Sequence, residues 1–289
     1  MKTKVSLVVI TFNEADNIER CLRSAKWVDE IVVLDSGSRD NTCELSKKLG
    51  AKLYVEAFRG YRAQKQRAVE LASNDWILSL DADEALSEGL SKEIQRMLED
   101  GEPYADGFEA PRISHYLGKW IRHGGWYPDY QLRFFDRKNA EWAGGEVHER
   151  VTSKQVARFA NPIEHWVFKD ISHQVAMNNL YSSLGARDLA RASRSASLFR
   201  MVTKPISKFV ETYILKLGFL DGLAGFIISV SAGYSMFLKY AKLWEIKKVR
   251  QEQLPDTVMK ERLGKGNVSK SDFENTNTDS TADATPNYS

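Results

Sequence analysis

The chain has little cysteine and little excess charge. Of its 289 residues only Cys21 and Cys43 are cysteines, and neither belongs to a C-x-x-C or other metal-type spacing. A disulfide framework is therefore excluded, and we expect two free thiols buried in helices, in a reducing compartment. Lysine and arginine number 41 against 39 acidic residues, so the net charge is only +2. Because nucleic-acid-binding proteins usually carry a broad basic excess, nucleic acid is not an expected partner.

Long hydrophobic runs are also scarce. The N-terminus, MKTKVSLVVITFNE, has an apolar run of only six residues and no small-residue cleavage site, so no signal peptide is expected. The uncharged run Gly222–Leu238 has 17 residues, fewer than the roughly 20 of a spanning helix. Its flanks are basic, with net charges of +5 over 187–220 and +4 over 239–250. We expect a helix that packs on the protein or lies on an anionic membrane surface. A buried helix pair with a solvated basic surface is the alternative.

The first hundred residues alternate between strand and helix patterns. Apolar runs predict strands at 5–10, 31–34, 53–55 and 76–80, and amphipathic stripes predict helices near 18–25, 42–49, 61–72 and 87–98. This order predicts an α/β fold with an open parallel sheet covered by helices on both faces. Ligands of such sheets bind beyond the carboxyl ends of the strands.

Three polar clusters follow the ends of these strands: TFNE at 11–14, DSGSRDNT at 35–42 and DADE at 81–84. The predicted sheet would bring them to one edge. The carboxylates of Asp81 and Asp83 suit Mg²⁺ or Mn²⁺, which would also hold a diphosphate. Solvated turns and helix caps are the alternative for each cluster. No glycine lies between the first strand and its helix, so a G-x-G-x-x-G loop and a P-loop are absent. A sugar nucleotidyltransferase would need a glycine-rich loop near the N-terminus, so this class of enzyme is not expected.

The rest of the chain changes character twice. Ten aromatic residues fall within 104–142, which predicts short strands and loops that build a binding surface. From Ser172 onward the pattern is helical, and Lys265–Ser289 is expected to be a disordered tail. We therefore expect one half of a domain at 1–100, a second half at 101–170, a helical region at 171–250 that possesses membrane affinity, and a tail at 265–289.

The three clusters together resemble a known family. The segments SLVVITFNEADNIERCLRS, IVVLDSGSRDNT and WILSLDADE are similar to the nucleotide-sugar half of family 2 glycosyltransferases, which have the GT-A fold and invert at the anomeric carbon. GGWYPDYQLRFF, GGEVHERV and YILKLGFLDGLAGF resemble the bacterial lipopolysaccharide inner-core β-1,4-glucosyltransferases of that family. The resemblance spans residues 4–245. It implies a GT-A fold, a Rossmann-like open mixed sheet, with a C-terminal helical extension. Residues 1–100 would form the nucleotide-sugar half of the GT-A domain, and residues 101–170 its acceptor half.

The resemblance also implies roles for residues of the first half. Asp81 and Asp83 would form the D-x-D pair that holds Mn²⁺ or Mg²⁺, with Asp83 as the direct ligand, and Asp35 would contact uracil. The nucleotide-sugar pocket would be lined by Thr11, Asn13, Glu14, Asp35, Lys65, Arg67 and Asp81.

An inverting transfer is a single in-line displacement, and it needs a general base for the acceptor hydroxyl. The element VHE offers Glu149 as this base, and His148 would complete the metal shell or touch the diphosphate. Glu146 and Asp129 are the alternative bases. Side chains alternate along an extended segment, so His148 and Glu149 would face opposite ways unless a bend intervenes.

The aromatic region supplies a predicted acceptor wall. Its members are Trp126, Tyr127, Asp129, Gln131 and Arg133. The guanidinium of Arg133 would fork onto a phosphorylated or carboxylated inner-core sugar. The alternative is that the aromatic residues belong to the core.

These expectations combine into one predicted activity. The chain would be an inverting glycosyltransferase that moves a hexose, glucose first, from a UDP-sugar to the heptose region of the lipopolysaccharide inner core. It would work in the cytoplasm, peripheral on the inner face of the inner membrane. The alternatives are a polyprenyl-phosphate or other cell-surface polysaccharide glycosyltransferase, which usually adds transmembrane helices, and a non-catalytic sugar-binding membrane scaffold.

Overall fold

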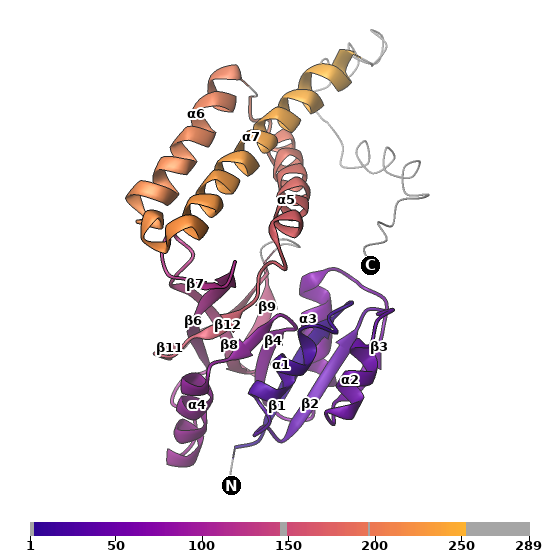
Figure 1. The fold of residues 1–289 in the computed structure, drawn as a ribbon. Coiled ribbons are helices and arrows are strands. Elements are labelled where there is room, and N and C mark those ends of the chain that lie inside the picture. The colour runs from indigo at the N-terminus through magenta and orange to yellow at the C-terminus, as the bar shows by residue number, and fades with distance from the viewer. Residues whose placement is uncertain (1–2, 145–148, 196, 253–289) are drawn as a thin grey trace. The chain divides into compact units, whose positions relative to one another are not determined.

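The computed structural model describes residues 3–144, 149–195 and 197–252 (Figure 1). The chain divides into two compact units. One holds residues up to Asn178 together with Ile206–Tyr234, and the other holds Asn179–Pro205 and the chain from Ser235 onward. The helical region predicted at 171–250 is thus shared between both units. The tail predicted at 265–289 lies outside the described residues.

Twelve strands are present in the described residues. They are β1 (Val5–Thr11), β2 (Glu30–Asp35), β3 (Lys52–Val55), β4 (Trp76–Asp81), β5 (Glu84–Leu86), β6 (Gly107–Tyr116), β7 (Lys119–Ile121), β8 (Asp129–Asp136), β9 (Ala140–Ala143), β10 (Arg150–Ser153), β11 (Val156–Arg158) and β12 (Ile163–His165). The helices are α1 (Ile18–Ser24), α2 (Thr42–Lys48), α3 (Tyr61–Leu71), α4 (Glu88–Asp100), α5 (Ile171–Arg191), α6 (Leu198–Phe209) and α7 (Gly222–Glu252), with a π-helix η1 (Val210–Leu215) and a 3₁₀-helix η2 (Gly218–Asp221).

The main sheet is mixed. Its strand order is β3-β2-β1-β4-β8-β6-β12-β5, with β7 and β11 also paired to β6. The first four strands in that order are parallel, as predicted, whereas β8 runs antiparallel to both β4 and β6. The register pairs Thr11 with Asp35 and Ile10 with Asp81, so the ends of three strands meet at one edge. The polar clusters that follow them lie side by side, as expected.

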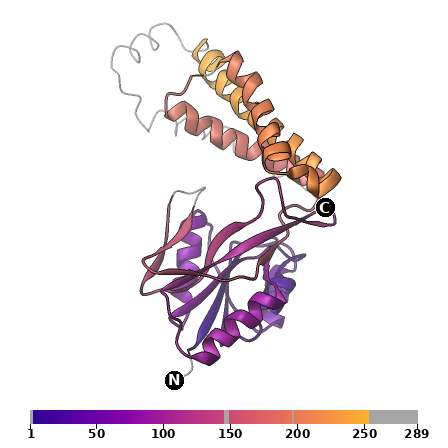
Figure 2. The same ribbon diagram turned by 90° about the vertical axis from the view of Figure 1, so that its left-hand side faces the viewer.

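Helices cover both faces of this sheet (Figure 2). Residues of β1 alternate between two apolar clusters. Val5, Leu7 and Val9 pack with α1 and α4, and Val8 packs with α3. Burial on both faces explains why β1 is a continuous apolar run. Helix α4 begins after Ser87, whose hydroxyl accepts a hydrogen bond from the Leu90 amide at 3.1 Å.

The short strand β5 was not predicted. It follows the DADE turn directly and pairs antiparallel with β12, which sets Glu84 opposite His165. Three residues are too few to show an alternating pattern in the sequence. The strand matters because it brings a histidine from far along the chain to the D-x-D turn.

Two expectations need correction. Cys21 is buried in α1, but Cys43 in α2 is only partly buried, because its helix lies at the edge that covers β3. The run Gly222–Leu238 belongs to a helix of 31 residues, longer than its uncharged part. By length and composition alone, the stretch Gly218–Lys248 is able to cross a membrane, with a mean hydropathy of 1.3. Core helices of soluble proteins pass the same test, and no spanning role follows from it.

Candidate active site

The loops after β1 and β2 are hydrogen bonded to each other. The Asn13 amide donates to Ser38 Oγ and the Glu14 amide donates to Thr42 Oγ1, both at 2.8 Å. Asn13 adopts a left-handed conformation with φ of 55°, which asparagine tolerates better than most residues. The two predicted nucleotide-pocket clusters therefore form one structural element at the edge of the sheet.

Asp35 organises this element from inside. Its side chain is fully buried, and its carboxylate accepts hydrogen bonds from Thr11 Oγ1, from the Gly37 amide and from the amide and hydroxyl of Ser38. Burial raises the pKa of Asp35, but the hydrogen bonds from Ser38 and Thr11 outweigh it and hold the pKa below its ordinary value. Asp35 shapes the loop in this structure, and its contact to uracil stays a prediction.

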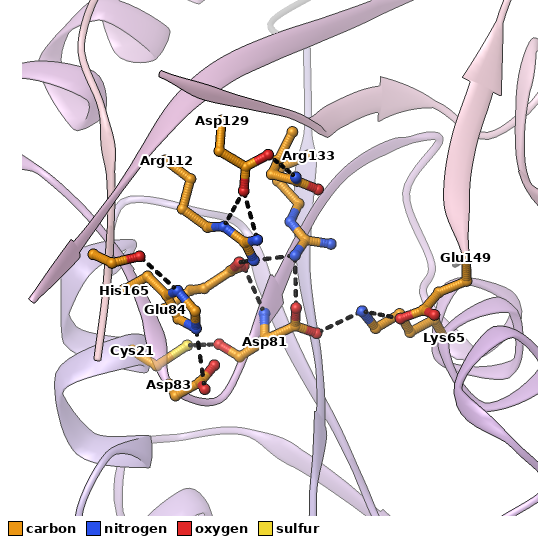
Figure 3. A network of polar contacts seen from close by, with 12 residues as sticks. Cys21, Lys65, Asp81, Asp83, Glu84, Arg112, Asp129, Arg133, Glu149 and His165 are labelled. Atoms are coloured by element: carbon orange, nitrogen blue, oxygen red, sulfur yellow. Dashed lines mark hydrogen bonds and ion pairs between the residues drawn. The ribbon is translucent and has the colours of Figure 1, made fainter. Parts of the chain in front are cut away.

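The D-x-D turn joins a network of buried charges (Figure 3). Asp81 Oδ1 lies 2.8 Å from Lys65 Nζ, and Asp81 Oδ2 lies 2.6 Å from Arg133 Nη2. Glu84, which is buried, accepts from Arg133 Nη2 at 2.8 Å and from Arg112 Nη1 at 2.9 Å. Each buried carboxylate thus faces a cation, which is the condition for keeping charges inside a protein.

Both acids of this network are held ionised. Burial raises the pKa of Asp81, but the charges of Arg133 and Lys65 outweigh it and keep that pKa well below the ordinary range. Burial also raises the pKa of Glu84, but the charges of Arg133, Arg112 and His165 together outweigh it and lower that pKa. At neutral pH the turn is therefore a pair of carboxylates neutralised by basic side chains.

The two aspartates of the D-x-D pair differ as metal ligands. Each oxygen of Asp81 has a cationic partner, Lys65 or Arg133, and its role as a ligand stays a prediction. Asp83 has one ion-pair contact among the described residues, from its Oδ2 to His165 Nε2 at 3.4 Å. Mg²⁺ and similar cations commonly take one or two protein carboxylates and complete their shell with substrate phosphates. Asp83 fits that role.

The described residues contain no group of three or more acidic, cysteine or histidine side chains arranged around a common metal position. Glu14 lies close enough to Asp83 for their charges to interact. Burial raises the pKa of Glu14, and the charge of Asp83 adds to that rise. The predicted ligand His148 and the alternative base Glu146 lie outside the described residues.

Glu149 reaches the same network from the other side. Its Oε1 lies 3.1 Å from Lys65 Nζ, and the ring of Trp142 lies 4.8 Å from that ammonium. Glu149 also lines a cavity of about 880 Å³ together with Gln131, Arg133 and Trp142. The predicted base and the D-x-D turn are thus linked through a single lysine.

Arg67 does not join this site. Its guanidinium pairs with Glu56 at 3.1 Å and with Glu70 at 3.4 Å, away from Asp81. Residues two apart on a helix point to nearly opposite sides, so Lys65 and Arg67 cannot both face the strand ends. The structure therefore does not bring Arg67 together with Asp81, and its place beside the nucleotide stays a prediction.

The predicted acceptor wall is divided. Trp126 packs against Tyr116 and Phe168, with ring centroids 6.1 and 6.3 Å apart, and so belongs to a small core. Tyr127 is partly buried and precedes a cis peptide bond to Pro128. Of the five residues of the predicted acceptor wall, two line the cavity that contains Glu149, namely Gln131 and Arg133.

The two charged members of the wall have partners within the protein. Asp129 is held by Arg112, with distances of 2.6 and 3.0 Å to Nη2 and Nε. Arg133 is buried and turned toward Asp81 and Glu84, so its fork is not presented to an anionic sugar. Asp81 and Glu84 both accept from the Nη2 atom of Arg133. The Arg133 Nε atom is buried without a hydrogen-bond partner.

Three residues of the network were not predicted as site residues: Glu84, Arg112 and His165. Glu84 is the last residue of the DADE cluster, and its place in that cluster was the signal from which its role could have been predicted. Arg112 and His165 belong to no motif and carry no sequence signal of their own.

Comparison with known proteins now places the chain. The sequence profile of the glycosyl transferase family 2 matches residues 6–160. The chain belongs to glycosyl transferase family 2. An uncharacterized glycosyltransferase of Rickettsia bellii (strain RML369-C) is 32% identical over 261 residues, which cover 84% of this chain and 87% of that protein. The predicted enzyme class is confirmed.

Two further relatives agree with the resemblance. The lipopolysaccharide core biosynthesis glycosyltransferase LpsC of Rhizobium meliloti (strain 1021) is 25% identical over 252 residues, which cover 84% of this chain and 93% of that protein. The mannosyltransferase PcManGT from Pyrobaculum calidifontis, solved in complex with GDP-Man and Mn²⁺, shares the fold at a TM-score of 0.50 and 14% identity. The match covers 86% of this family 2 chain and 89% of that one. The predicted GT-A fold is confirmed.

Proposed function

We propose that this glycosyltransferase moves a hexose from a UDP-sugar to the heptose region of the lipopolysaccharide inner core, with inversion at the anomeric carbon. Glucose is the proposed hexose. The similarity to LpsC along most of that protein's length supports the acceptor class. The observation that carries the proposal is the bridge of Lys65 between Asp81 and Glu149, because it joins the D-x-D turn to a carboxylate in a cavity.

The donor side of the reaction falls to the D-x-D turn. Asp83 would hold a divalent cation, Mn²⁺ or Mg²⁺, which offsets the charge that develops on the departing UDP. The Mn²⁺ of the PcManGT complex supports this choice. Asp81 keeps Lys65 and Arg133 in place behind the turn and so fixes the position of Asp83.

The acceptor side falls to Glu149. The acceptor oxygen forms a bond to the anomeric carbon while the bond from that carbon to UDP breaks, and the proton of the acceptor hydroxyl passes to the carboxylate. Lys65 holds Oε1 of Glu149, and among the described residues Oε2 has no hydrogen-bond partner. Oε2 is therefore the oxygen that would take the proton. Gln131, in the same cavity, would orient the acceptor sugar.

The proposed location is the cytoplasmic face of the inner membrane, with peripheral attachment. The basic C-terminal helices support it, since they suit anionic lipids. One observation favours a second candidate, a polyprenyl-phosphate glycosyltransferase. Such enzymes usually add transmembrane helices, and the stretch Gly218–Lys248 is long and apolar enough for one.

The test is a donor and acceptor screen with purified full-length protein and Mn²⁺ or Mg²⁺. UDP release is measured with UDP-hexoses against truncated lipopolysaccharide that ends in heptose, and against polyprenyl phosphate. We expect transfer to the heptose acceptor, with inverted anomeric configuration in the product. Transfer to polyprenyl phosphate alone would favour the second candidate, and a product with retained configuration would overturn the proposed mechanism.

A further inference from the structure

Helix α6, Leu198–Phe209, has an exposed apolar face. Leu198 and Phe199 are 74% and 75% exposed, and Val202 and Ile206 are 52% and 59% exposed. The spacing of these residues places them on one side of the helix. No residue of α6 is buried. A surface helix of a globular protein normally turns its apolar stripe toward a core, and α6 does not.

The opposite side of α6 is basic. Arg200, Lys204 and Lys208 follow one another at intervals of four residues, so they form a single row. The helix contains no acidic residue; Glu211, just beyond its end, pairs with Lys208 at 3.1 Å. An exposed apolar face with lysine and arginine on the other face is the pattern of a helix that lies in a membrane interface.

We propose that α6 lies in the surface of an anionic lipid bilayer, with Leu198, Phe199, Val202 and Ile206 among the acyl chains. The row of Arg200, Lys204 and Lys208 would face the headgroups. This inference rests on the peripheral location in the proposed function and names the element that makes the contact. It places that contact on α6, whereas the sequence left open whether Gly222–Leu238 packs on the protein or lies on a membrane.

The charge of this region indicates whether a bilayer or a second copy of this chain covers the apolar face of α6. The segment before the helix, 187–194, adds three arginines and one aspartate, so 187–208 carries six basic residues and one acid. A second copy would bring the same excess of positive charge close to this segment, and the two would repel each other. An anionic bilayer gains about 1 kcal/mol for each basic residue near its surface.

The experiment measures binding of the full-length protein to vesicles by co-sedimentation. The vesicles are neutral phosphatidylcholine, or the same lipid mixed with phosphatidylglycerol. The apolar-face variant is Phe199→Ser/Val202→Ser. Its matched control is Phe58→Ser/Val55→Ser, which changes the same residue types at positions that are 50% and 61% exposed outside α6. The basic-face variant is Arg200→Gln/Lys204→Gln.

We expect wild type to bind anionic vesicles and to lose that binding as salt rises. Phe199→Ser/Val202→Ser should lower the partition coefficient at least about tenfold, since two apolar side chains leave the acyl region. Arg200→Gln/Lys204→Gln should lower it about thirtyfold at low salt and little at high salt. The control should bind like wild type. Thermal unfolding should be unchanged in both α6 variants, because α6 buries no residue.

Three results would overturn the proposal. One is wild-type protein that binds neutral and anionic vesicles equally well. Another is binding by both α6 variants equal to wild type, which would assign the contact to the stretch Gly218–Lys248. The third is a wild-type dimer that Phe199→Ser/Val202→Ser converts to a monomer without a change in vesicle binding.

Transfer to a water-soluble heptose acceptor, measured with the same variants, keeps this test separate from the proposed function. That rate should be equal in wild type and α6 variants. If wild type shows no transfer to any acceptor, the proposed function fails while the vesicle result still decides the role of α6.

Discussion

Lys65 Nζ lies 3.1 Å from Glu149 Oε1, although the two residues are 84 positions apart in the sequence. The same ammonium lies 2.8 Å from Asp81 Oδ1. Lys65 is only 6% exposed, so it is a buried cation shared by two carboxylates that come from the two halves of the domain. Its position makes the geometry of Glu149 depend on the D-x-D turn.

Removing the charge of Lys65 should damage both stability and turnover. In Lys65→Met the carboxylates of Asp81 and Glu149 lose a shared cation. Removing one partner of a buried ion pair lowers the free energy of unfolding by about 3–5 kcal/mol. Lys65→Arg keeps the charge and should recover much of the unfolding free energy. Chemical denaturation and steady-state kinetics measure the two effects. Equal stability of Lys65→Met and wild type would contradict the network.

Glu149→Gln should bind donor like wild type and transfer the sugar very slowly. The substitution keeps the size of the side chain but removes the base, which typically costs about 10² to 10⁴ in rate. Calorimetry gives the donor Kd, and UDP release with acceptor gives turnover. Asp129→Asn is the matched control, because Asp129 is held by Arg112. If Asp129→Asn is slow and Glu149→Gln is not, the base is Asp129.

The sequence predicted the parallel half of the fold well, because strands buried on both faces leave continuous apolar runs that end at polar residues. The observed β1 is one residue longer than predicted at its end, and β2 is one residue longer at each end. The sequence did not predict that Arg133 pairs with carboxylates, because a lone arginine in a strand does not reveal whether a carboxylate or solvent faces it. Nor did it separate a sugar platform from the core at Trp126, since both uses favour the same residue type.

The two aspartates of the D-x-D pair should respond differently to the same change. Asp83→Asn should leave the thermal midpoint near wild type and weaken binding of UDP in the presence of Mn²⁺, because the carboxylate that fits a cation is lost. Asp81→Asn should lower the thermal midpoint, because Lys65 and Arg133 lose a buried partner. Calorimetric titration with UDP, with and without Mn²⁺, and thermal unfolding separate the two outcomes. Tight Mn²⁺-dependent binding by Asp83→Asn would contradict the assignment.

The stability of the fold should fall in acid, in part through Glu30 at the start of β2. Burial raises the pKa of Glu30, but hydrogen bonds from Lys52, Ser6 and Ser73 outweigh it and lower the pKa from 4.5 to about 2. A carboxyl with a depressed pKa in the folded state stabilises the fold above its unfolded pKa, and this contribution is lost as pH falls from about 4.5 toward 2. Glu30→Gln lacks that contribution at every pH. The difference in unfolding free energy between wild type and Glu30→Gln should therefore be about 2 kcal/mol larger at pH 7 than at pH 3, measured by urea denaturation. A difference that stays constant between these two pH values would show that Glu30 keeps an ordinary pKa in the folded protein.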